Sequence, residues 1–118
     1  MAGAAILVLT QMPDRASAQG LARALVEGRL AACVSIGAPV DSLYHWRGEI
    51  ETTQEMPVAI KTRAGRYAAV EAAILAQHPY ELPEILAVPI TNGLVRYLEW
   101  IGTETGGMTT HLWAVPKI

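Results

Sequence analysis

The chain of 118 residues contains no Phe and a single Cys, and it carries little net charge. One cysteine, Cys33, excludes an internal disulfide framework and any zinc or iron–sulfur site built from several cysteines. Nine Lys and Arg against eleven Asp and Glu leave a formal charge of −2. A dedicated nucleic-acid binder needs a surplus of cations to displace counterions, so we expect no nucleic-acid partner.

Long apolar runs are missing as well. The longest early run, residues 3–9, is far shorter than the roughly 20 residues of a membrane-spanning helix, and no basic segment precedes it as in a signal peptide. Hydrophobic residues make up 52% of the chain, too many for a disordered protein, and the length fits one domain. The sequence predicts a single cytoplasmic domain, 1–118, with no membrane partner.

Without Phe, the large aromatic surface comes from three Trp and four Tyr. These residues have a polar tip that prefers a partner, and they are more common at subunit interfaces than in dry cores. The composition therefore favours oligomerisation.

The first half of the chain reads as strand, helix, strand. Residues 4–9 are a short apolar run typical of a strand buried on both faces, and residues 30–36 read as a second strand. Asp14 is placed to cap a helix, and Gly28 is placed to end it in a left-handed conformation. The apolar stripe of this helix recurs at helical spacing: Ala18, Leu21, Ala22, Leu25 and Val26.

A long hairpin is predicted next. Its strands are residues 40–46 and 50–62, joined by a turn at 47–49. Pro57 lies inside the return strand but has no N–H for a sheet ladder. We therefore expect it at an edge, at a bulge or in an outward-facing position.

After the hairpin, the second half reads as helix, strand, helix. A helix begins near Tyr67 and must end at or before His78, because a proline follows. A rigid loop at 80–83 precedes a strand at 84–90 and a turn at 91–93. The apolar positions expected to be buried are Tyr67, Val70, Ile74 and Leu75 in the first helix and Leu94, Tyr97, Leu98 and Ile101 in the second. A glycine pair at 106–107 separates a short tail, 109–115.

This order predicts an α+β, ferredoxin-like βαββαβ sandwich with an extra C-terminal helix and tail. The helices cover one face of the antiparallel sheet. Because the strands are apolar on both sides and no further helix remains, other subunits are expected to cover the second face.

Motifs for familiar chemistry are absent: there is no phosphate loop, no GxSxG elbow and no HExxH pair. Nothing supplies a nucleophile or an oxyanion site, so we predict that the chain is not an enzyme. Cys33 reads as a small buried apolar residue, and the cluster around His45 as packing or interface rather than ligand stacking.

Residues 78–84 are the richest segment. They hold an imidazole, a phenol and two carboxylates, stiffened by two prolines. His78 and Glu84 are candidate ligands for a divalent metal, a donor set that suits Cu, Zn or Ni. The alternative is that His78 caps a helix C-terminus and that the carboxylates face solvent or pair with Lys61 or an Arg.

Several segments together resemble the CutA family of divalent-cation tolerance proteins. The most specific are the Tyr–x–Trp–x–Gly–x–Ile–Glu and His–Pro–Tyr–Glu–x–Pro–Glu motifs. The matching segments are 10–14, 30–34, 42–51, 60–62, 78–85 and 97–101. The resemblance covers about residues 4 to 102 in order, which is nearly the whole chain.

The resemblance implies a homotrimer with the architecture of PII signalling proteins, a role in divalent-cation tolerance and, for some members, copper binding. In copper-binding members a Cys stands at the position of Thr10 and a His at that of Gln77, whereas His78 is kept. It therefore implies a weak site for Cu(II) or another divalent ion at His78, with Glu84 or a neighbouring subunit's carboxylate.

An alternative function is a PII-like signalling module that binds a small-molecule effector in the clefts between subunits. In that case Tyr44, Trp46, Lys61 and the loop at His78 are expected to converge across the interface.

Overall fold

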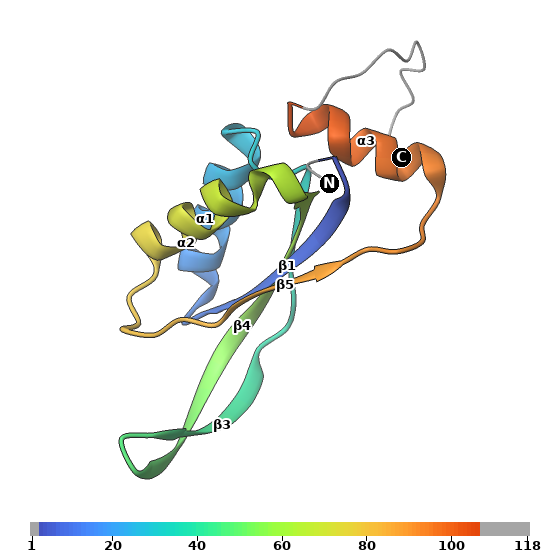
Figure 1. Cartoon of the computed structure of the whole chain (residues 1–118). Helices are drawn as coiled ribbons and strands as arrows, with labels where there is room; N and C mark the ends of the chain where they lie inside the picture. The colour runs from blue at the N-terminus through green and yellow to red at the C-terminus, as the bar shows by residue number, and fades with distance from the viewer. Residues whose placement is uncertain (1–2, 107–118) are drawn as a thin grey trace.

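The computed structural model describes residues 3–106, which form one antiparallel sheet and three α-helices (Figure 1). The elements are β1 (Ala5–Met12), α1 (Arg15–Glu27), β2 (Cys33–Ile36), β3 (Val40–Trp46), β4 (Glu49–Arg63), the 3-10 turn η1 (Ala64–Arg66), α2 (Tyr67–Gln77), β5 (Ile85–Pro89) and α3 (Val95–Glu104). The sheet order is β2-β4-β1-β5, and β3 extends the pairing along β4. This confirms the predicted α+β, ferredoxin-like fold.

Helices α1 and α2 lie together on one face of the sheet and enclose the core (Figure 1). Along β1, every second residue is buried beneath these helices, beginning with Ile6 and ending with Met12. The strand period of two therefore sorts β1 into a helix-facing row and an opposite row. The core joins three helix residues of α1, two of α2 and the sheet: Ile6, Val8, Met12, Ala18, Leu21, Leu25, Ala31, Met56, Val58, Ile60, Val70 and Ile74.

Helix α1 begins as predicted and ends differently. The Asp14 carboxylate accepts the Ser17 N–H at 2.8 Å, and this bond holds the pKa of Asp14 below its ordinary value. At the other end Gly28 has φ −82°, so the prediction of a left-handed Gly28 is wrong; Arg29 takes that conformation, with φ 58°. The reason is a Schellman closure one residue later, in which Leu30 N–H bonds the Leu25 carbonyl at 2.9 Å.

The hairpin forms as predicted, and Pro57 lies opposite a bulge. Arg47 and Gly48 both have positive φ, 53° and 83°, as a tight hairpin turn requires. From the pair Ile36–Val58 to the pair Val40–Glu55, β4 advances by three residues. The segment between β2 and β3 advances by four, so it contains one extra residue, which forms the bulge. Pro57, which has no N–H to donate, thus lies where the partner of β4 changes from β2 to β3.

The second half also follows the prediction, with three corrections. Helix α2 ends at Gln77 and His78 is extended, as the following proline requires. Leu75 is 53% exposed, so it does not belong to the buried stripe. Residues 91–93 form no turn, and α3 begins after Leu94, which is exposed rather than buried. The predicted tail, 109–115, lies outside the described residues.

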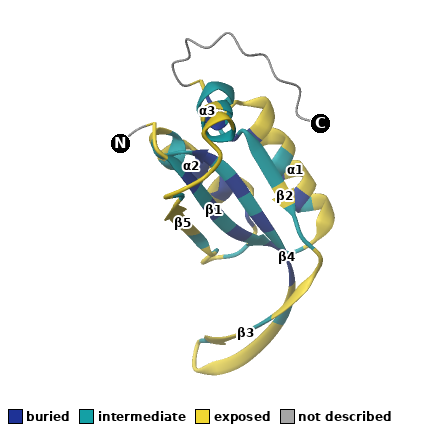
Figure 2. Cartoon of the chain, turned by 90° about the vertical axis from the view of Figure 1, so that its right-hand side faces the viewer, coloured by how far each residue is buried: buried dark blue, intermediate teal, exposed yellow. Residues whose placement is uncertain are grey.

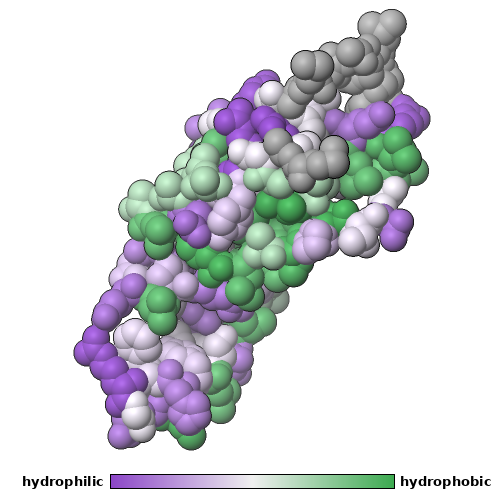
Figure 3. All heavy atoms as spheres, in the orientation of Figure 1, coloured by the Kyte–Doolittle hydropathy of each residue, from purple (hydrophilic) through white to green (hydrophobic). Residues whose placement is uncertain are grey.

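The face of the sheet opposite α1 and α2 is apolar and only partly covered. Leu7 and Leu9 of β1 pair with Val88 and Leu86 of β5, which are 43% and 55% exposed. Figure 3 shows hydrophobic residues gathered over this central region. Among residues 3–106, α3 packs only at one end of this face, where the Lys61 Nζ lies 5.9 Å from the centre of the Tyr97 ring. We call this surface the open face.

A second exposed feature is the arm formed by β3 and the first half of β4. It projects from the domain and lengthens the molecule to 54 Å, against 27 and 25 Å in the other directions (Figures 1 and 2). Leu43 and Ile50, on one side of the arm, are each 69% exposed. The open face and the arm thus both expose large apolar side chains, and apolar patches of this kind often mark an interaction surface.

Candidate functional site

His78 lies at the C-terminal end of α2 and is 9% exposed. Its Nε2–H donates to the Gln11 carbonyl of β1 at 2.6 Å, and its Nδ1 accepts the Tyr80 N–H at 3.2 Å. This pattern requires the neutral imidazole with its proton on Nε2. His78 therefore fastens the loop after α2 to the end of β1.

Both ring nitrogens of His78 are thus in use. A metal ion needs a free nitrogen lone pair, and the Nδ1 pair accepts the Tyr80 N–H. The alternative, that His78 caps a helix, holds in part: it is the C-cap residue of α2, but its ring bonds β1 and not the helix carbonyls.

The carboxylates of the loop do not complete a metal site. Glu84 is exposed, and Glu81 accepts a hydrogen bond from the Arg47 guanidinium at 2.6 Å. Among residues 3–106, no three His, Cys, Asp or Glu side chains lie close enough together to hold a metal ion. His78 and Glu84 therefore do not form a ready site for a tightly held divalent ion, and copper or another ion as a cofactor stays a prediction.

Glu55 is buried and pairs with the partly exposed Tyr80, a pairing that the sequence did not reveal. Glu55, an acidic residue of β4, is only 8% exposed. Burial raises the pKa of the Tyr80 phenol above its ordinary value of 10.0, and Glu55 raises it further through its negative charge and a hydrogen bond. The Tyr80 ring also lies 4.6 Å from the His78 ring, centre to centre. We call Gln11, Glu55, His78 and Tyr80 the His78 cluster.

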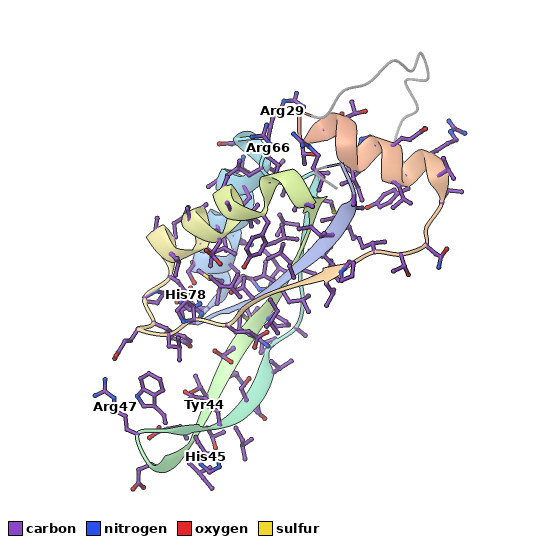
Figure 4. All side chains as sticks on the ribbon, viewed as in Figure 1. Arg29, Tyr44, His45, Arg47, Arg66 and His78 are labelled. Atoms are coloured by element: carbon purple, nitrogen blue, oxygen red, sulfur yellow. The ribbon has the colours of Figure 1, made fainter. Side chains whose placement is uncertain are left out.

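The arm contacts the loop beside this cluster (Figure 4). The Arg47 guanidinium that bonds Glu81 also lies 5.3 Å from the centre of the Trp46 ring. The Tyr44 hydroxyl lies 2.6 Å from the Thr53 hydroxyl across the hairpin. His45 is exposed and does not join them. The Arg47–Glu81 ion pair therefore holds the tip of the arm against the 78–84 loop, and the Tyr80–Glu55 pair holds its base.

Other predicted site residues lie elsewhere. Tyr44 pairs with Glu51, and Lys61 is ten residues farther along β4, about 33 Å at the usual rise of a strand, so in one chain Lys61 does not reach Tyr44. Convergence across an interface stays a prediction. The Thr10 hydroxyl is buried with no partner among the described residues, and Gln77 is exposed. Cys33 is partly exposed rather than buried.

A family model described as "CutA1 divalent ion tolerance protein" matches residues 6–104. A curated relative from Thermus thermophilus, named "Divalent-cation tolerance protein CutA", is 41% identical over 100 residues, which is 85% of this chain and 97% of that protein. A relative of the same name from Pectobacterium atrosepticum is 40% identical and covers 85% and 91%.

Solved structures agree with the family match. The crystal structure of CutA from Xylella fastidiosa superposes with a TM-score of 0.83 at 46% identity and covers 86% of this chain and 97% of that one. The CutA1 structure from the psychrotrophic Shewanella sp. SIB1 has a TM-score of 0.83 at 43% identity and covers 85% and 94%. The likeness therefore includes the fold as well as the sequence over 85–86% of this chain.

Proposed function

Because the chain belongs to the CutA1 divalent ion tolerance family, we propose that it acts in tolerance of divalent cations as a homotrimer. The match over residues 6–104, with 41% identity to a curated tolerance protein, supports the cellular role. These family names describe a tolerance protein and not an enzyme. The assembly is supported by the open face.

The open face carries the argument for self-association. Leu86 and Val88 remain 55% and 43% exposed beside Leu7 and Leu9, although side chains of this kind contribute roughly 1.5–3 kcal/mol each when buried. Stable folds bury an apolar sheet face by packing it against another apolar layer. In a closed symmetric trimer, one type of interface is repeated three times, and it would supply such a layer to each of the three chains.

Light scattering coupled to gel filtration tests the assembly. We expect a mass of about 38 kDa, which is three times 12.7 kDa. Leu86→Glu places a charge on the open face and should reduce the mass, whereas Leu75→Glu, on the outer surface of α2 with nearly the same exposure, 53% against 55%, should not. A wild-type chain that runs as a folded monomer would contradict the proposed assembly.

Growth measurements test the cellular role. A bacterial strain from which its own CutA has been deleted should tolerate less Cu²⁺ and Zn²⁺ in the medium, and expression of this chain should restore its growth. Leu75→Glu should restore growth as well, because it leaves the open face intact. A wild-type chain that is soluble and abundant but restores no growth would refute the role in cation tolerance.

Two further points belong to this proposal. Similar proteins include one named chloroplastic and a solved structure titled periplasmic, so the cytoplasmic location stays a prediction. No helix among the described residues is long and apolar enough to cross a membrane. No observation favours the PII-like signalling alternative, and we do not propose it.

A further inference from the structure

Three arginines converge on the last turn of α3, far from the His78 cluster. Arg29 follows α1, Arg63 ends β4 and Arg66 belongs to η1 (Figure 4 labels Arg29 and Arg66). Arg29 bonds the Glu104 carboxylate at 3.1 Å and the Glu104 carbonyl at 3.4 Å. We call these three residues the arginine cluster.

Arg63 and Arg66 share a single acceptor. The Arg63 Nη2 and the Arg66 Nε lie 3.1 and 2.9 Å from the Thr105 carbonyl oxygen, so these two nitrogens are at most 6.0 Å apart. Two positive groups at this separation repel each other, and a nearby anion would offset this repulsion. Within residues 3–106, neither arginine has a carboxylate within 4.0 Å.

The positive charge of the cluster is only partly neutralised. Three guanidinium groups face one carboxylate, that of Glu104, and a helix C-terminus that carries roughly half a negative charge. About one and a half positive charges therefore remain, in a chain whose formal net charge is −2. Residues 107–118 contain no Asp or Glu, so no side chain of that segment supplies the missing anion.

The backbone is shaped around these side chains. Arg29 adopts φ 58° although Gly28, which accommodates that conformation at lower cost, is its neighbour. Gly106 has φ 78°, and a Cβ at this position would lie 2.7 Å from the Arg66 Nη2. A left-handed arginine and a left-handed glycine thus stand beside the guanidinium groups that meet at this helix end.

The donors that remain determine what the cluster can bind. Arg66 bonds Thr105 through Nε alone, and Arg29 bonds Glu104 through Nη1 alone, so both keep N–H groups without an acceptor among the described residues. Planar guanidinium groups bind tetrahedral oxyanions through paired hydrogen bonds. A phosphate group carries the double charge and enough oxygens to bridge two arginines.

We propose that Arg29, Arg63 and Arg66 form an oxyanion site that binds the phosphate group of a small molecule. The site is separate from cation tolerance, because it takes ligands of the opposite charge and lies at the other end of the sheet from the 78–84 loop. Binding there would hold α3 on the domain through the shared arginines.

Calorimetric titration with inorganic phosphate tests this site, with sodium chloride of equal ionic strength as the reference. We expect saturable binding to the wild-type chain and at least a tenfold loss of affinity in Arg66→Gln and Arg29→Gln. The matched control is Arg23→Gln, because Arg23 is an exposed arginine of α1 that pairs with Glu27 away from the cluster. Arg66→Lys, which keeps the charge but loses the planar fork, should bind with intermediate affinity.

A second measurement separates binding from folding. The side-chain Nε–Hε signal of Arg66 in an NMR spectrum should shift on addition of phosphate and not on addition of chloride, in the folded wild-type chain. If phosphate produces neither heat nor a shift, the arginines only cap α3 and the proposal is wrong. It is also wrong if Arg23→Gln loses as much affinity as Arg66→Gln, or if Arg66→Gln changes the mass of the assembly while phosphate has no effect.

Discussion

His78 shows how one side chain joins separate parts of the fold. Its ring bonds a β1 carbonyl and a loop amide, and its own N–H bonds the Ile74 carbonyl at 2.9 Å. The ring is therefore a structural connector between α2, β1 and the 78–84 loop. A residue in this role affects stability first and ligand binding second.

We expect His78→Ala to lower the free energy of unfolding by about 1–3 kcal/mol, because the buried Gln11 carbonyl and the Tyr80 N–H lose their partner. Gln77→Ala, at the exposed neighbouring position, should change it by less than about 0.5 kcal/mol. Urea denaturation measures both. Equal stability of the two variants would show that the ring does not hold the loop.

His78→Ala, together with Glu84→Ala, also tests the predicted metal site. Binding of Cu²⁺ through His78 must displace one of its hydrogen bonds, so we expect a weak site. If His78 and Glu84 are the ligands, His78→Ala and Glu84→Ala should each abolish the heat of Cu²⁺ binding in calorimetry. Unchanged heats in both variants would remove these residues as ligands.

Tyr80 should make the stability depend on alkaline pH. Because the folded chain raises the pKa of this phenol above 10.0, the unfolded chain loses its proton first as the pH rises. Stability is therefore complete below about pH 10 and declines above it. Tyr67, whose pKa is also raised, through its bond to Glu71, should first be replaced by Phe. In that background, Tyr80→Phe should flatten the decline in urea denaturation between about pH 9 and 11. An unchanged slope would contradict the interaction of Tyr80 with Glu55.

At the scale of the elements, local patterns predicted most of the fold. The Asp14 cap and the end of α2 before Pro79 depend on neighbouring residues, so they could be inferred without a structure. The Glu55–Tyr80 pair and the arginine cluster depend on residues 25 to 75 positions apart, for which sequence spacing gives no signal. The left-handed Arg29 was missed because a neighbouring glycine is the usual choice.

The bulge at the base of the arm makes a prediction about Gly37. A Cβ on Gly37 would lie 2.9 Å from the Pro57 Cγ, in the rigid ring opposite the bulge. We expect Gly37→Ala to destabilise the chain by about 1–3 kcal/mol, because one of the two segments must move. Gly20→Ala, inside α1 with nothing within 4 Å, should instead stabilise it by about 0.5–1 kcal/mol. If thermal unfolding shows no difference in sign, the bulge does not fix the arm.

At the scale of the whole molecule, the open face and the arm set different requirements on a partner. The open face is a broad apolar layer, whereas the arm extends beyond the domain and has its own apolar side at Leu43 and Ile50. An isolated hairpin is only marginally stable in water. Contacts with another copy would therefore stabilise the arm as well as cover the sheet.

Assembly of this kind couples stability to protein concentration, since association favours the folded state by mass action. We expect the melting temperature of the wild-type chain to rise with concentration, and the double variant Leu43→Ser/Ile50→Ser to melt lower at equal concentration. Leu75→Ser, an exposed leucine on the outer surface of α2 at 53% exposure, serves as the control away from the arm. If the double variant melts like the control and keeps the same mass, the arm makes no contact with another copy, and the open face alone must hold the assembly.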